Sequence, residues 1–113
     1  MAIQTSSLKN TLASAYAGAA LYGALFTTAP SSTAGTEVTG GSPAYARKAL
    51  SWSAPANGVI TASATFDVPA CIVKGTGVYS AATAGTYLDG NTVADVTFTG
   101  QDTVTVTFTY TQS

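Results

Sequence analysis

Val59-Ile60-Thr61-Ala62-Ser63-Ala64-Thr65-Phe66-Asp67-Val68 is the stretch that decides the fold of this chain of 113 residues. From Ile60 onward every second side chain is apolar, and the side chains between them are Thr, Ser or Asp. A period of two is typical of a β-strand with one face on a core and the other toward solvent. Asn57-Gly58, which suits positive backbone φ, precedes the stretch, and Pro69 follows it. The pattern therefore predicts a strand over residues 59–68 that begins after a turn and ends at proline.

The C-terminal residues 103–111 show the same alternation. Threonine occupies one side, and the other side carries Val104, Val106, Phe108 and Tyr110. A face made of threonine predicts a sheet surface that is solvated or that contacts another subunit. Asp89-Gly90 predicts a two-residue hairpin turn. Shorter strands are expected at residues 49–53, 86–88, 92–93 and 96–99, and residues 71–73 and 77–80 are expected to form one further strand or a pair, with a bend or bulge at residues 74–77.

The N-terminal third has no charged residue between Lys9 and Glu37, so a membrane span and a signal peptide both have to be weighed. Glycine, serine and threonine interrupt its apolar residues, which argues against a span, and one lysine before the apolar stretch is a poor signal sequence. A structural helix over about 7–27, capped by Ser6 or Ser7, explains the segment better. Its apolar stripe is expected to pack on the core and consists of Leu8, Leu12, Ala15, Ala19, Tyr22 and Phe26.

These elements predict a mainly β fold, a small antiparallel β-sandwich of about seven strands preceded by one α-helix. The chain is expected to form a single domain over residues 1–113, with a loop over about 28–48 and the sandwich over about 49–112. The alternative is an extended or intertwined β-structure whose core is completed by neighbouring chains.

Charged residues make up only 8% of the chain, far below the roughly 25% of an average soluble protein. Such a surface has little electrostatic protection against association, so we expect other subunits to cover much of it. A monomer whose surface is rich in threonine and serine is the alternative. The net charge is −1 and the four basic residues are scattered, which argues against direct contact with nucleic acid.

The residue types that most catalytic and metal sites need are scarce. The chain has no histidine and one cysteine, Cys71, which excludes Ser-His-Asp and Cys-His arrangements, an intrachain disulfide and ordinary zinc sites. Most of the acids lie in or beside predicted turns, where aspartate is expected for backbone reasons. Trp52 and Tyr79, which could form a sugar platform, occupy positions typical of core strand residues. We therefore expect no enzyme activity, cofactor, metal or small-molecule substrate.

One charged block stands out in this nearly neutral chain, Gly35-Thr36-Glu37-Val38-Thr39-Gly40-Gly41-Ser42-Pro43-Ala44-Tyr45-Ala46-Arg47 with Lys48 after it. Glu37, Tyr45, Arg47 and Lys48 are the candidate site residues. Opposite charges in such a chain would form an oriented ion pair that either pins the loop to its own sandwich or grips a neighbouring subunit.

The block, with Leu25-Phe26-Thr27 and a loop of small residues before it, resembles small bacteriophage virion proteins that are often labelled tail fibre or virion structural proteins. The resemblance is specific in the first half of the chain and only β-rich in the second. It implies a non-enzymatic virion component, assembled in the bacterial host cytoplasm, whose partners are major capsid or tail proteins and copies of itself.

Three functions are compatible with these observations. The first is an accessory protein that decorates and reinforces the capsid through contacts between subunits. The second is a tail-fibre or minor tail component that contacts the host envelope. The third is a secreted carbohydrate-binding β-sandwich, which requires an exposed aromatic platform.

Overall fold

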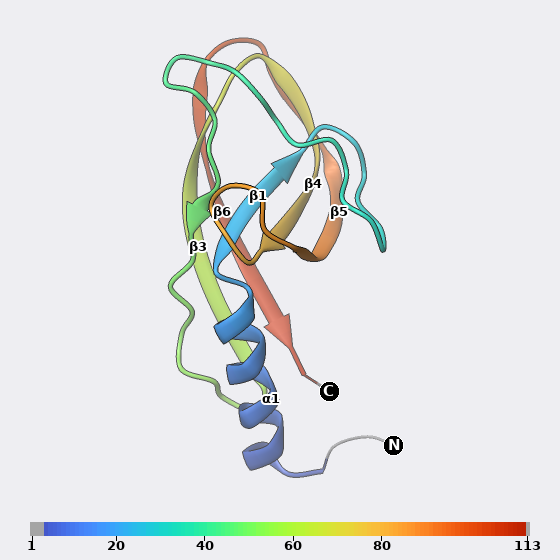
Figure 1. The fold of residues 1–113 in the computed structure, drawn as a ribbon, viewed down its shortest axis with the longest axis vertical. Coiled ribbons are helices and arrows are strands. Elements are labelled where there is room, and N and C mark those ends of the chain that lie inside the picture. Colours follow the sequence, from blue (N-terminus) through green and yellow to red (C-terminus); the bar gives the residue numbers. More distant parts are fainter. Residues whose placement is uncertain (1–3, 113) are drawn as a thin grey trace.

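The computed structural model describes residues 4–112, which form one helix and six strands in two antiparallel sheets (Figure 1). The larger sheet has the strand order β2-β1-β4-β5, and the smaller pairs β3 with β6. This confirms the mainly β, sandwich-like fold with an N-terminal helix. The molecule is elongated, 47 × 23 × 22 Å, with the helix at one end of the long axis. The elements are α1 (Ser6–Ala19), β1 (Tyr22–Phe26), β2 (Lys48–Ala49), β3 (Val59–Val68), β4 (Cys71–Tyr79), β5 (Tyr87–Phe98) and β6 (Asp102–Thr111).

The two strands with the clearest alternation form the smaller sheet. β3 and β6 pair over their whole length, from Val59 opposite Thr111 to Val68 opposite Asp102. The apolar side of β3 is buried, and on the other side hydroxyls pair across the strands, Ser63 with Thr107 at 3.1 Å and Thr65 with Thr105 at 2.9 Å. The predicted turn is also confirmed, since Asn57 and Gly58 have φ of 50° and 77°. The largest fully buried side chains of β3 are Ile60, Phe66 and Val68.

The predicted helix over 7–27 is too long. Helix α1 ends at Ala19, and Tyr22–Phe26 form strand β1, which pairs with β2 on one side and β4 on the other. β1 is also buried on both faces, because Leu25 belongs to the main core and Ala24 and Phe26 belong to a second apolar cluster, so its successive residues are apolar and imitate a continuing helical stripe. Pairing with two strands outweighs the local spacing. The cap is also one residue earlier than expected, because the Thr5 Oγ1 accepts the Leu8 N–H at 3.3 Å.

The face of α1 that packs on the sandwich is not the predicted stripe. Ala13 is fully buried, while Leu8 and Leu12 are 47% and 37% exposed. An aromatic cluster fixes how α1 is rotated about its own axis. Tyr16 stacks on Tyr110 with ring centroids 3.9 Å apart and meets Trp52 edge to face at 5.8 Å. The expectation that the whole stripe packs on the core is therefore wrong for its leucines.

Six strands replace the expected seven because predicted breaks are absent. Residues 86–88, 92–93 and 96–99 fall largely within the single strand β5, with Asp89-Gly90 inside it rather than at a hairpin turn. Gly90 pairs with Gly77 of β4, and a Cβ at either glycine would collide with neighbouring side chains. The Asp-Gly sequence thus serves close packing. Residues 71–73 and 77–80 likewise belong to the single strand β4, whose register shifts between Val73 and Gly75, in agreement with the bulge expected at residues 74–77.

The strand expected at residues 49–53 is also shorter than predicted, since β2 contains only Lys48–Ala49. Beyond it the chain is held by single hydrogen bonds. The Leu50 N–H donates to the Leu21 carbonyl at 2.9 Å, and the Trp52 indole N–H donates to the Ala20 carbonyl at 2.8 Å. These bonds fix the segment between β2 and β3 against the end of α1.

Candidate functional site

The charged block lies in the long connection between β1 and β2. Its first part runs beside β1, because the Thr27 N–H donates to the Thr36 carbonyl at 2.7 Å and the Val38 N–H donates to the Leu25 carbonyl at 3.1 Å. Glu37 therefore sits next to the end of β1, opposite Phe26. The chain then turns back, and Arg47 immediately precedes β2.

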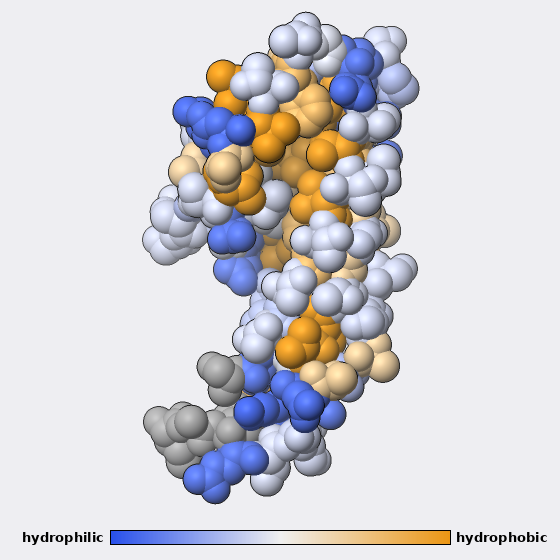
Figure 2. All heavy atoms as spheres, turned by 180° about the vertical axis from the view of Figure 1, so that it is seen from behind, coloured by the Kyte–Doolittle hydropathy of each residue, from blue (hydrophilic) through white to orange (hydrophobic). Residues whose placement is uncertain are grey.

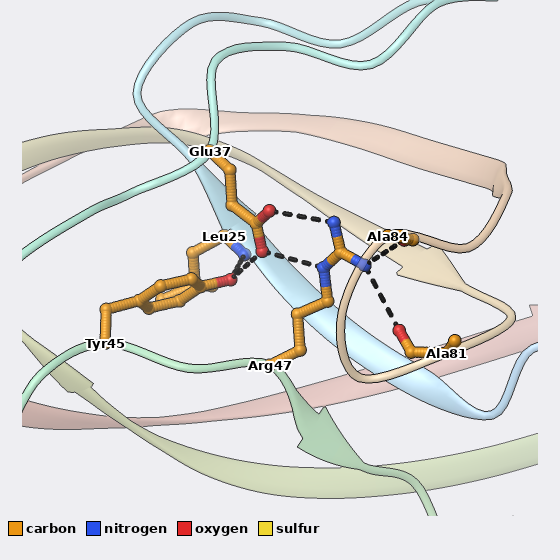
Figure 3. Close-up of polar contacts among 6 residues, drawn as sticks. All are labelled: Leu25, Glu37, Tyr45, Arg47, Ala81 and Ala84. Carbon is orange, nitrogen blue, oxygen red and sulfur yellow. Dashed lines mark hydrogen bonds and ion pairs between the residues drawn. The ribbon is translucent and has the colours of Figure 1, made fainter.

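The centre of the block is a bidentate ion pair between Arg47 and Glu37 (Figure 3). Arg47 Nε donates to Glu37 Oε2 and Arg47 Nη2 donates to Glu37 Oε1, both at 3.0 Å. The Arg47 side chain is 11% exposed and that of Glu37 is 24% exposed. Geometry of this kind gives directional, charge-assisted hydrogen bonds that solvent screens only in part.

Arg47 also holds a second loop. Its Nη1 donates to the Ala81 carbonyl at 3.1 Å and to the Ala84 carbonyl at 2.6 Å, in the turn between β4 and β5. The guanidinium carbon lies 3.5 Å from the centroid of the Tyr79 ring, at the end of β4. One side chain thus joins two connecting segments and a strand of the larger sheet.

Tyr45 links the ion pair to the core. Its hydroxyl donates to Glu37 Oε2 at 2.7 Å and accepts the Leu25 N–H at 3.0 Å, while its ring stacks on Phe66 of β3 at 6.2 Å. Burial raises the pKa of Tyr45 well above the usual value, and the hydrogen bond to Glu37 acts in the same direction. The hydroxyl therefore stays protonated and keeps donating.

The structure brings three of the four candidate residues together and leaves the fourth apart. Lys48 approaches Asp67 of β3, with Nζ 3.8 Å from Oδ2, and the two side chains are 38% and 28% exposed. The sequence offered no signal for the carbonyls of Ala81 and Ala84, since any residue has a carbonyl and the turn's shape depends on Ala84 at φ 53°. The arrangement positions loops, and its polar groups are engaged with one another.

Alkaline pH is expected to destabilise the fold through the buried tyrosines. Burial raises the pKa of Tyr45, and also that of Tyr16, whose hydroxyl donates to Asp89 Oδ2 at 2.9 Å. Above about pH 10 the unfolded chain releases these protons while the folded chain keeps them. The contribution of the two tyrosines to the free energy of unfolding is therefore fully present below about pH 10 and decreases above it. Urea unfolding at a series of alkaline pH values measures this. Tyr45→Phe should show a shallower decline, and an equal decline in both proteins would contradict the assignment.

A second feature, missed by the sequence analysis, is an open groove between β5 and β6. Each strand is at the edge of its sheet, and the two lie on either side of a cavity of about 280 Å³. Figure 2 shows this hollow with hydrophobic side chains inside it. At the helix end the hydrogen bond from Tyr16 to Asp89 crosses from α1 to β5. The apolar side chains that line the groove include Val73, Val93, Val96, Phe98, Val104 and Val106.

The aromatic residues weighed as a sugar platform are engaged elsewhere. Tyr79 is 7% exposed and lies under Arg47, and Trp52 packs on Tyr16 with its indole N–H bonded to a backbone carbonyl. Within residues 4–112 there is no group of three or more metal-ligating side chains. In the same range no helix has the length and apolar character that crossing a membrane requires.

Comparison with known proteins supplies the family. The family described as podophage GP4 fiber I protein gp80 matches residues 4–112, which is nearly the whole chain. Among curated proteins and solved structures there is no significant match. The match extends the resemblance seen in the first half of the sequence to the β-rich second half. The chain therefore belongs to the family of the podophage GP4 fiber I protein, and it is a bacteriophage virion protein of the fibre class.

Proposed function

We propose that this protein is a non-enzymatic component of a phage tail fibre, which joins the virion through contacts with other tail proteins and with copies of itself. The observation that carries the proposal is the family match over residues 4–112. Capsid decoration, the first hypothesis from composition, gains no support from that match, which favours the fibre alternative. Low charge and a compact length are compatible with either position, so composition could not separate them.

Two structural observations support a role in assembly. One is that the polar groups of the charged block bond to one another and to the neighbouring loop, and so hold these segments in place; they belong to Glu37, Tyr45 and Arg47. The other is that β5 and β6 each pair with a strand on one side only, and the apolar groove lies between them. Both are long strands, and the free edge of a long strand is a surface on which proteins add further strands. As a fibre component, the protein would join its neighbours through such surfaces and would lie in the part of the virion that contacts the host envelope.

The location of the protein in the particle tests this function. We expect quantitative mass spectrometry to detect the protein in complete virions and to find none in DNA-filled heads that lack tails. The major capsid protein, measured in the same samples, is the internal control because it stays with the heads. Retention of the chain in tailless heads at many copies per particle would overturn the fibre assignment and restore capsid decoration.

A further inference from the structure

The exposed side of α1 carries an apolar stripe that the single chain does not use. The inner side is fixed by three contacts: Ala13 is fully buried, Tyr16 stacks on Tyr110, and the Asn10 side chain accepts the Gly58 N–H at 2.9 Å. The face turned away from these contacts presents Leu8, Leu12, Ala15 and Ala19, all of them exposed. In a helix that packs on one sheet, leucines are expected on the packed side, and here they point to solvent.

The spacing of this stripe is that of a helix that meets another helix. Successive residues are four, three and four positions apart, which is the repeat that forms the seam of a coiled coil. A second copy related by a twofold axis would place the same apolar stripe opposite this one, as in the isologous contacts of most dimers. The neighbouring polar side, made of Ser7, Thr11, Ser14 and Gly18, has small or short side chains that permit close approach.

We infer that α1 binds the α1 of a second copy of this chain through Leu8, Leu12, Ala15 and Ala19. Charge supports the same partner: Lys9 is the only charged residue of α1, and it lies outside the stripe, so two identical helices meet without like charges in the seam. A lipid surface is the poorer occupant, because helices that lie on membranes carry several basic residues along the polar face. The inference rests on the proposed self-association in a fibre and assigns it a surface.

The contact is expected to be weak between two free chains. A helix of 14 residues with two leucines offers much less than the roughly 800 Å² per partner of a stable protein complex. Within a particle, neighbouring copies are held close, and a weak contact then gains from a high effective concentration. The test must therefore trap brief contacts as well as stable ones.

Disulfide trapping meets this requirement, because Cys71 can first be replaced by alanine to leave no native thiol. In that background Leu12→Cys and Ala15→Cys place thiols in the stripe, and Thr11→Cys and Ser14→Cys place them on the polar side with the same spacing. All four positions are exposed, so the pairs are matched in access. Under mild oxidation we expect the stripe variants to form disulfide-linked dimers at least about tenfold faster than the polar-side variants, since a disulfide needs Cβ atoms about 3.5–4.5 Å apart.

The outcomes decide both the contact and its direction. Fast dimers from either stripe variant alone indicate parallel helices, and fast dimers only when the two variants are mixed indicate antiparallel helices; both support the proposal. The same measurement in purified virions covers copies that associate only in the particle. Equal rates at the stripe and control positions in both preparations would overturn the inference. Because the location measurement does not depend on α1, a negative result here would leave the fibre assignment standing.

Charge substitution gives a second, independent readout. Leu8→Glu with Leu12→Glu adds two acids to the stripe, and Ser7→Glu with Thr11→Glu adds two acids to the adjacent polar side, both pairs four residues apart. Chemical cross-linking of the full chain, in solution at increasing concentration and in purified virions, traps brief contacts and should show dimers lost in the first variant and retained in the second. If both variants associate as the unchanged chain does, the stripe is not the contact.

Discussion

Replacing Phe66 with alanine is expected to lower the free energy of unfolding by about 3–5 kcal/mol, the usual cost of removing a fully buried aromatic ring. Phe66 is 0% exposed, packs against Phe108 of β6 and stacks on Tyr45. Its loss opens a cavity between the smaller sheet and the loop that the ion pair holds. Since small domains are stable by only about 5–15 kcal/mol, a loss of this size removes a large share of the total stability.

Urea unfolding followed by far-UV circular dichroism measures this loss. Thr65→Ala is the matched control, because Thr65 is the preceding residue on the exposed face of β3 and only its hydroxyl contact with Thr105 is lost. The control should cost less than about 1 kcal/mol. Equal losses in the two variants would mean that the core does not lie on the Phe66 side of the strand.

Replacing Arg47 with alanine is expected to cost about 2–3 kcal/mol. The change leaves the partly buried Glu37 carboxylate without its cation and removes the donors of the Ala81 and Ala84 carbonyls. Removing one partner of a fully buried pair costs about 3–5 kcal/mol, and the 24% exposure of the Glu37 side chain reduces that penalty. The turn between β4 and β5 should loosen as well, since Arg47 supplies two of its contacts.

The neighbouring Lys48→Ala provides the control for the Arg47 variant. Lys48 meets Asp67 through a single contact of 3.8 Å and its side chain is 38% exposed, so its removal should cost less than about 0.5 kcal/mol. Arg47→Lys should fall between the two, because lysine keeps the charge but cannot reproduce the two-pronged contact with Glu37. Amide hydrogen exchange should report faster exchange at residues 80–86 in Arg47→Ala only. Equal stability of the two alanine variants would show that the ion pair contributes nothing to the loop.

The parts of the fold that were predictable are those that local pattern decides. The strand at residues 59–68 and the strand at residues 103–111 followed from alternation, and the turn at Asn57-Gly58 followed from residues that adopt positive φ. The opposite charges of Glu37 and Arg47, in a chain with few charges, were enough to anticipate an ion pair. Each of these signals lies within a few residues of the feature that it predicts.

The parts that were missed depend on distant partners. The apolar run of β1 imitates a helix, and only its pairing with β2 and β4 makes it a strand. Asp89-Gly90 imitates a hairpin turn, but Gly90 lies inside β5, where a Cβ would collide with the Tyr87 hydroxyl and Pro30. The rotation of α1 depends on Tyr110, at the other end of the sequence. No local spacing reports contacts of this kind.

The pairing of β3 with β6 also has a mechanical meaning. Both strands run along the long axis of the molecule, and their hydrogen bonds lie across it over the full 10-residue length of each strand (Figure 1). A force that pulls β3 at the helix end and β6 at the opposite end would load the whole ladder in shear, so the hydrogen bonds would share the load and would not open one after another. The smaller sheet thus resists stretching along the molecule's length when the force enters its two strands at opposite ends.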